Sequence, residues 1–538
     1  MSTLSAAPLL TREVSYPIRR GLERETLRSS PDGGIALTPH PRALGSKLAH
    51  PHITTDFCEA QLELISGVCD TPEALLTEMR SIHECVYAGI GDELLWPTSM
   101  PSELPAADAA IPLAQYGTSN AALTKTTYRN GLGLRYGRAM QTICAVHYNV
   151  SFSDDVFEAL AAAEGVPNTQ DFRDAKYFNA MRNFRAASWL VVYLFGASPV
   201  VSDSFVTGRA NDFERLTSGT LHLPFATSLR CGGLGYQSDI QAQHLQVTYN
   251  NLGEYVSSLA GAITSTYPAY ATPGRNEKPG QLNDCILQSE AEFYSSVRAK
   301  RAADGHHSGL AALASEGVEY IEVRLLDIDP TSDLGVSAET LRFMDSLLIW
   351  CLLAPAAQHD SRRCDEIAEN VATTVLRGRE PGIHLHDNGV ARTLTGWGRA
   401  LLDEIAPAAD WLDACEANVP ESRHRQSLAV QRARLDDARE TPSARMIEAL
   451  TARNLSFNAW ALELAGEHRE ALAARGDDAT VARFARLADD SLAAQAQADA
   501  VKEAQTFDEH LRALQRGYAD LLKRNEGPAA QAGSAVTP

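Results

Sequence analysis

The sequence lacks the signatures of several common protein classes. Its nine cysteines are odd in number and none stands in a C-x-x-C pair, which excludes a disulfide framework and a zinc ribbon. The phosphate-binding pattern G-x-x-x-x-G-K-S/T is also absent, so the chain is not a P-loop enzyme. We therefore expect reduced, mostly buried thiols, as in a cytoplasmic protein.

Long apolar runs and an excess of basic charge are missing as well. The most apolar stretches, 186–201 and 346–357, are shorter than the roughly 20 residues that a membrane-spanning helix needs. No signal-peptide pattern begins the chain. Acidic residues number 68 against 48 basic ones, a net charge of −20, and such a surface repels phosphate backbones and anionic lipids. We expect no nucleic-acid or membrane partner and a cytoplasmic location.

Length and patterning favour a mixed fold. The 538 residues are 44% hydrophobic and 22% charged, as in an ordinary folded chain. Short polar strands do not alternate cleanly with crossover helices, which favours an α+β class over a doubly wound parallel sheet. We expect a core over 1–408, a helical region packed on it over 409–526, and a disordered tail over 527–538. The predicted elements are strands at 19–28, 54–65, 139–152 (with a turn at its start) and 318–327, and helices at 72–89, 172–194, 341–353 and 364–376.

Acidic residues share faces of the first two predicted strands. Residues two apart in a strand point to the same face, which places Glu23 beside Glu25. The same rule places Glu59 and Glu63 on one face of the strand 54–65. Asp56 is out of phase with them, so we expect it to act from the strand entry or past a bulge.

Two further strands add polar groups of a different kind. Glu322 and Arg324 share the face opposite Ile321 and Val323, and His147 lies on the polar face of its strand. For any one strand, a solvated polar side is the simpler interpretation. Four such strands in one chain favour a shared site.

Converging carboxylates need a cation between them. Grouped acids repel and raise their own pKa values unless positive charge intervenes. Glu, Asp and His without thiolate are typical ligands of hard divalent ions such as Mg²⁺ or Mn²⁺. Because Mg²⁺ usually binds a few carboxylates together with substrate phosphates, the pattern indicates nucleotide chemistry.

A glycine-rich stretch at 131–137 lies among three arginines. Its spacing does not match the dinucleotide fingerprint, and we interpret it as a turn. The flanking Arg129, Arg135 and Arg138 are candidates for contact with anionic groups.

Eight motifs, in order along the chain, resemble the proteobacterial-type glutamate–cysteine ligases. They are GLERETLR (21–28), ITTDFCEAQLE (53–63), WPTSMP (96–101), QYGTSN (115–120), VHYNVS (146–151), YLFGASP (193–199), FATSLR (225–230) and EYIEVRLLDIDP (319–330). The helical C-terminal part follows the family more loosely.

The resemblance implies a fold and a reaction. The fold would be a curved, mainly antiparallel sheet like the catalytic domain of glutamine synthetase, surrounded by helices, with residues 1–408 as the ATP-dependent ligase core. The reaction would join the γ-carboxyl of glutamate to the amino group of cysteine through a γ-glutamyl phosphate, giving γ-glutamylcysteine, ADP and phosphate in the first step of glutathione synthesis. ATP would be the co-substrate and Mg²⁺, or alternatively Mn²⁺, the metal. Feedback by glutathione would be possible, and we expect a monomer.

The resemblance also implies roles for particular residues. Arg324 would face the transferred phosphoryl group and act with Glu322, and Arg129 would meet phosphate. The positions that match metal ligands are Glu23, Glu25, Asp56, Glu63, His147 and Glu322. The positions that match the cysteine pocket are Arg230, Tyr236 and Tyr294 around the carboxylate, and Phe57, Tyr128, Leu132 and Gln141 around the thiol.

Two alternatives stay open at this point. The loop between Arg230 and Tyr236 contains Gly232 and Gly233 and is richer in glycine than the family pattern, which leaves room for another small amine as acceptor. A catalytically silent nucleotide-binding homologue is the other alternative. None of the metal-matching carboxylates is missing, which counts against it.

Overall fold

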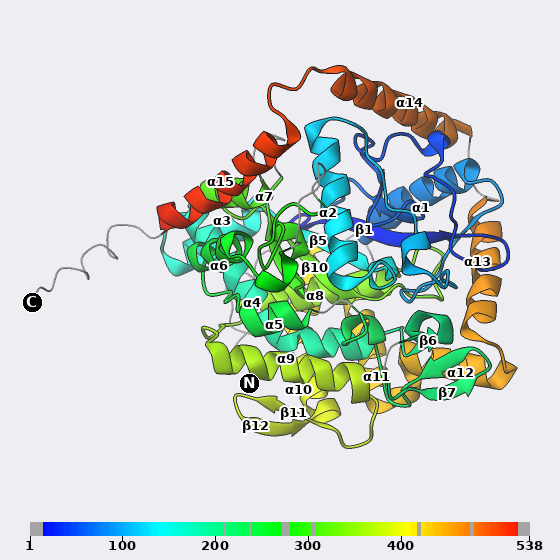
Figure 1. Ribbon diagram of the computed structural model, residues 1–538. Helices are drawn as coiled ribbons and strands as arrows, with labels where there is room; N and C mark the ends of the chain where they lie inside the picture. Colours follow the sequence, from blue (N-terminus) through cyan, green and yellow to red (C-terminus); the bar gives the residue numbers. More distant parts are fainter. Residues whose placement is uncertain are drawn as a thin grey trace, which may run out of the picture.

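A seven-stranded antiparallel sheet lies at the centre of the molecule (Figure 1). The computed structural model describes residues 14–208, 211–235, 238–271, 280–302, 308–416, 421–473 and 478–525. The strand order is β2 (Ile53–Thr55), β3 (Gln61–Ile65), β1 (Ile18–Ser29), β5 (Val146–Phe152), β10 (Tyr320–Leu326) and β9 (Val297–Lys300), with β4 (Leu94–Leu95) paired to β1. Tyr236 and the predicted tail at 527–538 lie outside the described residues.

Two smaller antiparallel sheets and fifteen helices complete the part of the chain that the structure describes. The smaller sheets are β6 (Val200–Ser202) with β8 (Thr220–His222) and β7 (Glu214–Thr217), and β11 (His384–Asp387) with β12 (Val390–Thr393). The helices are α1 (Pro72–Gly89), α2 (Asn120–Tyr136), α3 (Asp154–Glu164), α4 (Gln170–Phe195), α5 (Asp239–His244), α6 (Leu252–Thr264), α7 (Gly309–Glu316), α8 (Ala338–Leu353), α9 (Ser361–Arg377), α10 (Leu394–Cys415), α11 (Arg423–Asp436), α12 (Pro442–Arg453), α13 (Phe457–Ala473), α14 (Asp478–Ala500) and α15 (Phe507–Asn525). The predicted α+β class is confirmed.

One face of the central sheet is buried against helices and contains polar groups that the alternation did not reveal. Arg20 projects from this face of β1 and donates to Asp345 of α8 from Nε at 2.9 Å and Nη2 at 2.7 Å. Tyr148 of β5 donates to the other oxygen of the same carboxylate at 2.6 Å. Because all three side chains are buried, this paired network ties α8 to the back of the sheet.

The predicted strand at 54–65 is wrong in its centre, where the chain makes a turn. The segment is the hairpin of β2 and β3, closed by hydrogen bonds from the Asp56 amide to the Gln61 carbonyl and from the Gln61 amide to the Cys58 carbonyl. Residues 57–62 are all buried, so the apolar pattern continues through the turn. Glu59 therefore does not share a face with Glu63, and it binds Lys47 Nζ at 2.6 Å instead.

The predicted turn at 131–137 is also wrong, because helix α2 continues through it to Tyr136. Glycine at position 131 is explained by the close approach of another side chain to the helix, and not by a turn. A Cβ on Gly131 would lie 2.0 Å from Oε1 of Gln288. The segment before β9 can therefore lie against α2, and Gln288 donates to the Tyr128 carbonyl at 3.2 Å.

The C-terminal helices run along the outside of the molecule. Figure 1 shows α13, α14 and α15 passing from one side of the core across the top to the other. The predicted boundary at residue 408 falls inside helix α10, which is continuous there. The division of the chain into a core and a helical region remains a prediction. No helix in the described ranges has the length and apolar character to cross a membrane. All nine cysteines are free thiols, and seven are buried, as predicted.

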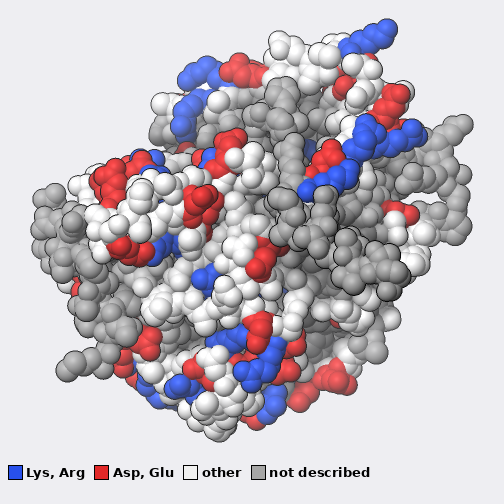
Figure 2. All heavy atoms as spheres, turned by 90° about the vertical axis from the view of Figure 1, so that its left-hand side faces the viewer, with Lys and Arg blue, Asp and Glu red and all other residues white. Residues whose placement is uncertain are grey.

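Surface charge is mixed on the side that carries α15 and α7. Figure 2 shows small groups of acidic and basic side chains there, interspersed with uncharged residues. A ligand that approaches this side meets both signs of charge over short distances.

Candidate active site

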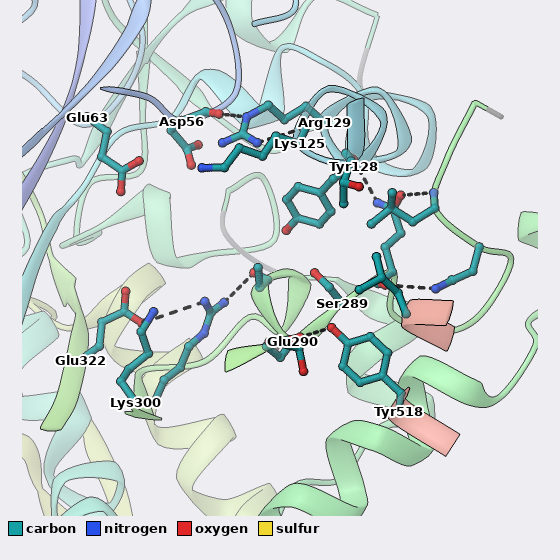
Figure 3. Close-up of a pocket in the computed structure, with 18 of the residues that line it drawn as sticks. Asp56, Glu63, Lys125, Tyr128, Arg129, Ser289, Glu290, Lys300, Glu322 and Tyr518 are labelled. Carbon is teal, nitrogen blue, oxygen red and sulfur yellow. Dashed lines mark hydrogen bonds and ion pairs between the residues drawn. The ribbon is translucent and has the colours of Figure 1, made fainter. Parts of the chain in front are cut away.

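A cavity of about 510 Å³ opens on the polar face of the central sheet. Its size lies within the range of small-molecule sites. Figure 3 shows Asp56, Glu63 and Glu322 on one side of it, with Glu290 and Tyr518 across from them. Strands β1, β3, β5, β9 and β10 supply one wall, and α2, the segment 282–291 and α15 supply most of the rest.

Three ligand atoms converge in this cavity from three neighbouring strands. Glu23 on β1 pairs in register with His147 on β5, and Glu322 on β10 pairs with Asn149 two residues further along β5. One ligand atom each from Glu23, His147 and Glu322 lies within 4.8 Å of the others. Two carboxylates and an imidazole at this spacing fit a divalent cation.

Positive side chains surround the carboxylate of Glu322. Arg324 Nη1 is 2.8 Å from Oε1, while Lys300 Nζ and Arg298 Nη1 are 3.7 and 4.0 Å from Oε2. Burial alone would raise the pKa of Glu322, but these cations hold the pKa well below its usual range. Glu322 is therefore ionised and available as a ligand.

A second group of carboxylates has the opposite electrostatic character. Glu25 pairs in register with Glu63 on β3, and Asp56 lies in the adjoining hairpin turn. Burial, followed by the negative charges of Glu23 and Asp56, raises the pKa of Glu63 to about 8. Burial and the charge of Asp56 raise the pKa of Glu25 well above its usual range. Positive charge brought by a ligand would stabilise this group in its ionised form.

Arg129 and Lys125 project from α2 toward the same carboxylates. The Arg129 guanidinium stacks 4.5 Å from the centre of the Tyr116 ring and donates to the backbone carbonyls of Thr55 and Asp56. Burial and the neighbouring charge of Arg129 lower the pKa of Lys125. Through its two carbonyl contacts, Arg129 holds the β2–β3 turn beside the cavity.

A smaller cavity of about 60 Å³ adjoins the first and shares Glu25, Asp56 and Arg324 with it. Tyr294 lines it, and so do all four residues predicted for the thiol pocket: Phe57, Tyr128, Leu132 and Gln141. Gln141 donates to the Tyr294 hydroxyl at 3.0 Å, which fixes the two side chains relative to each other.

Arg230, predicted to bind the cysteine carboxylate, contacts the backbone of Arg324, which lines this pocket. Its Nε is 2.6 Å from Asp327, and both terminal nitrogens are 3.3 Å from the Arg324 carbonyl. It is 2% exposed and lines neither described cavity, so the structure places it as a support for β10. Its predicted companion Tyr236 falls outside the described residues.

Several cavity residues were not identified from the sequence. Lys300 and Arg298 belong to β9, which was not predicted as a strand, although their two-residue spacing in Val297–Lys300 is the signal that could have found them. Glu290 lies in the segment before β9 and Tyr518 on α15. Nothing in the local pattern connects these two distant segments to the site.

Sequence comparison matches this chain to one enzyme family. Residues 10–374 match the family model described as glutamate-cysteine ligase. The chain is 44% identical over 460 residues to the glutamate–cysteine ligase of Janthinobacterium sp. (strain Marseille), covering 85% of this chain and 86% of the relative. It is 42% identical over 506 residues to that of Alcanivorax borkumensis, covering 92% and 95%.

A solved structure extends the comparison to the whole fold. The crystal structure of glutamate–cysteine ligase from Francisella tularensis in complex with AMP superposes with a TM-score of 0.86 at 31% identity, covering 94% of this chain and 99% of that one. A bifunctional glutathione synthetase from Pasteurella multocida shares the fold, with a TM-score of 0.69 at 24% identity, covering 87% of this chain and 53% of that one. The chain belongs to the glutamate–cysteine ligase family.

Proposed function

We propose that the acidic cavity is where this protein joins the γ-carboxyl of glutamate to the amine of cysteine at the expense of ATP. The single observation that carries the proposal is the meeting of Glu23, His147 and Glu322, with Arg324 directly beside Glu322. Phosphoryl transfer depends on positioning the reacting groups and on neutralising the charge of the phosphates, and a cation held by these residues beside an arginine would do both.

Magnesium is the metal that these donors suit, with manganese as the alternative. We assign as ligands the residues predicted from the sequence, Glu23, Glu25, Asp56, Glu63, His147 and Glu322. All six line the cavity. When bound, the ion would neutralise the β- and γ-phosphates of ATP and orient them toward the glutamate carboxylate.

Arg324 and Arg129 are the protein's own contribution to phosphate binding. Arg324 reaches both Glu322 and, at 3.3 Å, His147 Nδ1, so its guanidinium is held at the edge of the ligand cluster. A planar guanidinium there can bind two oxygens of the transferred phosphoryl group at once. Arg129 lies on the opposite wall of the same cavity and can meet the remaining phosphates.

The smaller cavity is our candidate for the cysteine side chain. Phe57 and Leu132 give it an apolar wall, and Tyr128, Gln141 and Tyr294 add polar edges. Its junction with the main cavity at Glu25 and Arg324 would bring the amine of cysteine to the γ-glutamyl phosphate. We keep Tyr236 and Arg230 as candidates for binding the carboxylate of cysteine.

The wider setting is also a proposal. We expect a cytoplasmic monomer with a ligase core over 1–408 and a packed helical region over 409–526, and we include feedback by glutathione in the proposal.

The acceptor amine is tested by following ADP release with glutamate and MgATP while cysteine, 2-aminobutyrate and unrelated amines are compared. We expect cysteine and its close isostere to support turnover. Preference for an amine without a cysteine-like shape would favour a different γ-glutamyl ligase, and nucleotide binding without any turnover would indicate a silent homologue.

A further inference from the structure

One of the eight motifs, QYGTSN at 115–120, has no part in the proposed function, since none of its residues lines either cavity of the site. It forms the turn that leads into α2, and the end of α14 lies against this turn. Gln495 of α14, 379 residues after Tyr116, donates to the Tyr116 carbonyl at 2.8 Å. Glu503, just after α14, accepts from the Asn120 amide at 2.8 Å. The C-terminal region therefore holds the start of α2 in place.

Asp499 of α14 makes the central contact with the turn. Its Oδ1 accepts from the amides of Thr118 at 2.7 Å and Ser119 at 3.0 Å. The first amides of a helix have no partner within the helix, and its positive end favours a negative charge. The hydrogen bond from the Thr118 amide is the main cause that lowers the pKa of Asp499. Asp499 is therefore ionised at neutral pH and caps α2 from another helix.

Gly117 makes this close contact between the turn and α14 possible. Its φ of +126° is a conformation that other residues rarely adopt. A Cβ at this position would lie 2.8 Å from both carboxylate oxygens of Asp499. Glycine in the motif is thus explained by the approach of α14.

Tyr116 connects the turn to the cavity. Its side chain is fully buried, and its hydroxyl donates to the Thr55 carbonyl, next to Asp56, at 2.7 Å. The Arg129 guanidinium lies 4.5 Å and the Lys125 ammonium 5.5 Å from the centre of its ring, as in cation–π contacts. Figure 3 shows both cations beside Asp56. The contacts therefore run without a gap from α14 to two cations of the cavity wall.

We propose that Asp499 is a positioning residue for the phosphate-binding side of the cavity. It acts by fixing the 116–119 turn, so that Tyr116 holds Arg129 and Lys125 in place. The inference rests on the proposed function, in which Arg129 meets phosphate. Helix α14 would then influence how the cavity binds its anionic ligand, although none of its described residues lines that cavity.

The test compares Asp499→Ala with Asp499→Asn and with a matched control, Asp490→Ala, at an exposed position of the same helix. Steady-state constants are measured for the full-length protein. We expect Asp499→Ala to raise KM for ATP about 5-fold, as for the loss of one helix cap. We expect kcat to stay nearly unchanged, because contacts to phosphates that are not transferred are equally strong in the ground and transition states.

The two other variants should keep the wild-type KM for ATP. Asparagine retains an oxygen that accepts from both amides, and it is as good a cap as aspartate. A purely structural role of Asp499 would lower the amount of folded enzyme, and hence the apparent kcat, without changing KM. An unchanged KM in Asp499→Ala would overturn the inference, and so would an equal rise in Asp499→Asn or in Asp490→Ala.

Binding of MgADP, measured by calorimetry, gives a readout that does not depend on turnover. We expect Asp499→Ala to weaken it about 5-fold and the two other variants to leave it unchanged. If the wild type binds MgADP and Asp499→Ala binds it more weakly, but neither releases ADP from the complete reaction mixture, the proposed function fails and the inference stands. Normal ADP release together with wild-type MgADP affinity in Asp499→Ala would defeat the inference alone. Absence of MgADP binding by the wild type would overturn both.

Discussion

Glu23 and His147 lie directly opposite each other on β1 and β5, with Glu23 Oε2 3.2 Å from His147 Nδ1. Glu322 approaches the same ring nitrogen to 3.7 Å from β10. Each strand brings one donor to a common point, and a register slip of one residue would turn that donor to the opposite face of the sheet. The site therefore depends on strand pairing as much as on the residues themselves.

Replacement of Glu322 by glutamine should abolish most activity while the protein stays folded. The change removes one negative charge from the proposed metal site and keeps the size of the side chain. We expect kcat/KM to fall about 100-fold, comparable to the loss of one preorganised electrostatic contact. The matched control is Glu158→Gln, at an exposed position of α3. Full turnover in Glu322→Gln would remove this residue from the metal site.

Replacement of Arg324 by lysine should be nearly as damaging, although the charge is kept. A lysine ammonium is a point charge and cannot bind two phosphate oxygens with the geometry of a planar guanidinium. We expect a loss of kcat of roughly 100-fold, measured against Arg512→Lys at an exposed position of α15. Near-normal turnover would show that Arg324 does not contact the phosphoryl group.

Metal binding should release protons and strengthen as pH rises toward 8. The pKa of Glu63 is raised to about 8, so in the absence of metal this carboxyl holds a proton at neutral pH. A cation must displace that proton, which weakens binding at low pH. We expect tighter Mn²⁺ binding at pH 8.5 than at pH 6.5, measured by calorimetry in two buffers that differ in ionisation enthalpy. Equal affinity and no proton release would contradict the assignment of Glu63.

The same group makes a prediction for the stability of the metal-free protein. Its folded pKa lies above the unfolded value of about 4.3, so the folded state holds the extra proton between these two pH values. The corresponding stability is complete below the unfolded pKa and is lost as pH rises through about 8. We therefore expect Mg²⁺ to raise Tm more at pH 8.5 than at pH 6.5. A Tm increase that is independent of pH would count against this linkage.

His424 should give a second pH dependence on the helix-covered side of the central sheet, where it contacts Asp345. Burial opposes its charge, but the carboxylates of Asp413, 3.1 Å away, and Asp345, 3.9 Å away, raise its pKa above the usual value. The stabilisation is complete below the unfolded pKa of about 6.5 and is lost as pH rises through the higher folded pKa. Denaturant midpoints measured above pH 6.5 should fall more in the wild type than in His424→Gln. Identical pH profiles would show that His424 is neutral when folded.

The sequence was informative wherever strand alternation alone decides which way a side chain points. Glu23, Glu25, His147, Glu322 and Arg324 could be placed on one face because their strands are regular and have a clear apolar side. The eight motifs then supplied roles that alternation cannot supply. The α+β class followed from the same pattern.

The rest of the site depends on distant contacts. The grouping of Glu59 with Glu63 on one strand face was wrong because a buried turn keeps the apolar period of a strand. The prediction of a turn at 131–137 was wrong. Gly131 lies in a helix and allows Gln288 to approach it closely, which a single sequence does not show. Lys300 and Tyr518 come from elements brought to the cavity only by tertiary packing.

The central claim, that acidic side chains from separate strands hold a divalent cation at the phosphates of a nucleotide, is tested most directly by crystallography with Mn²⁺ and ADP. Manganese can be located by its anomalous scattering. The account predicts a manganese peak within bonding distance of Glu23, His147 and Glu322, with the diphosphate beside Arg324. A manganese peak elsewhere, or ADP bound outside the cavity with no metal between these residues, would contradict it.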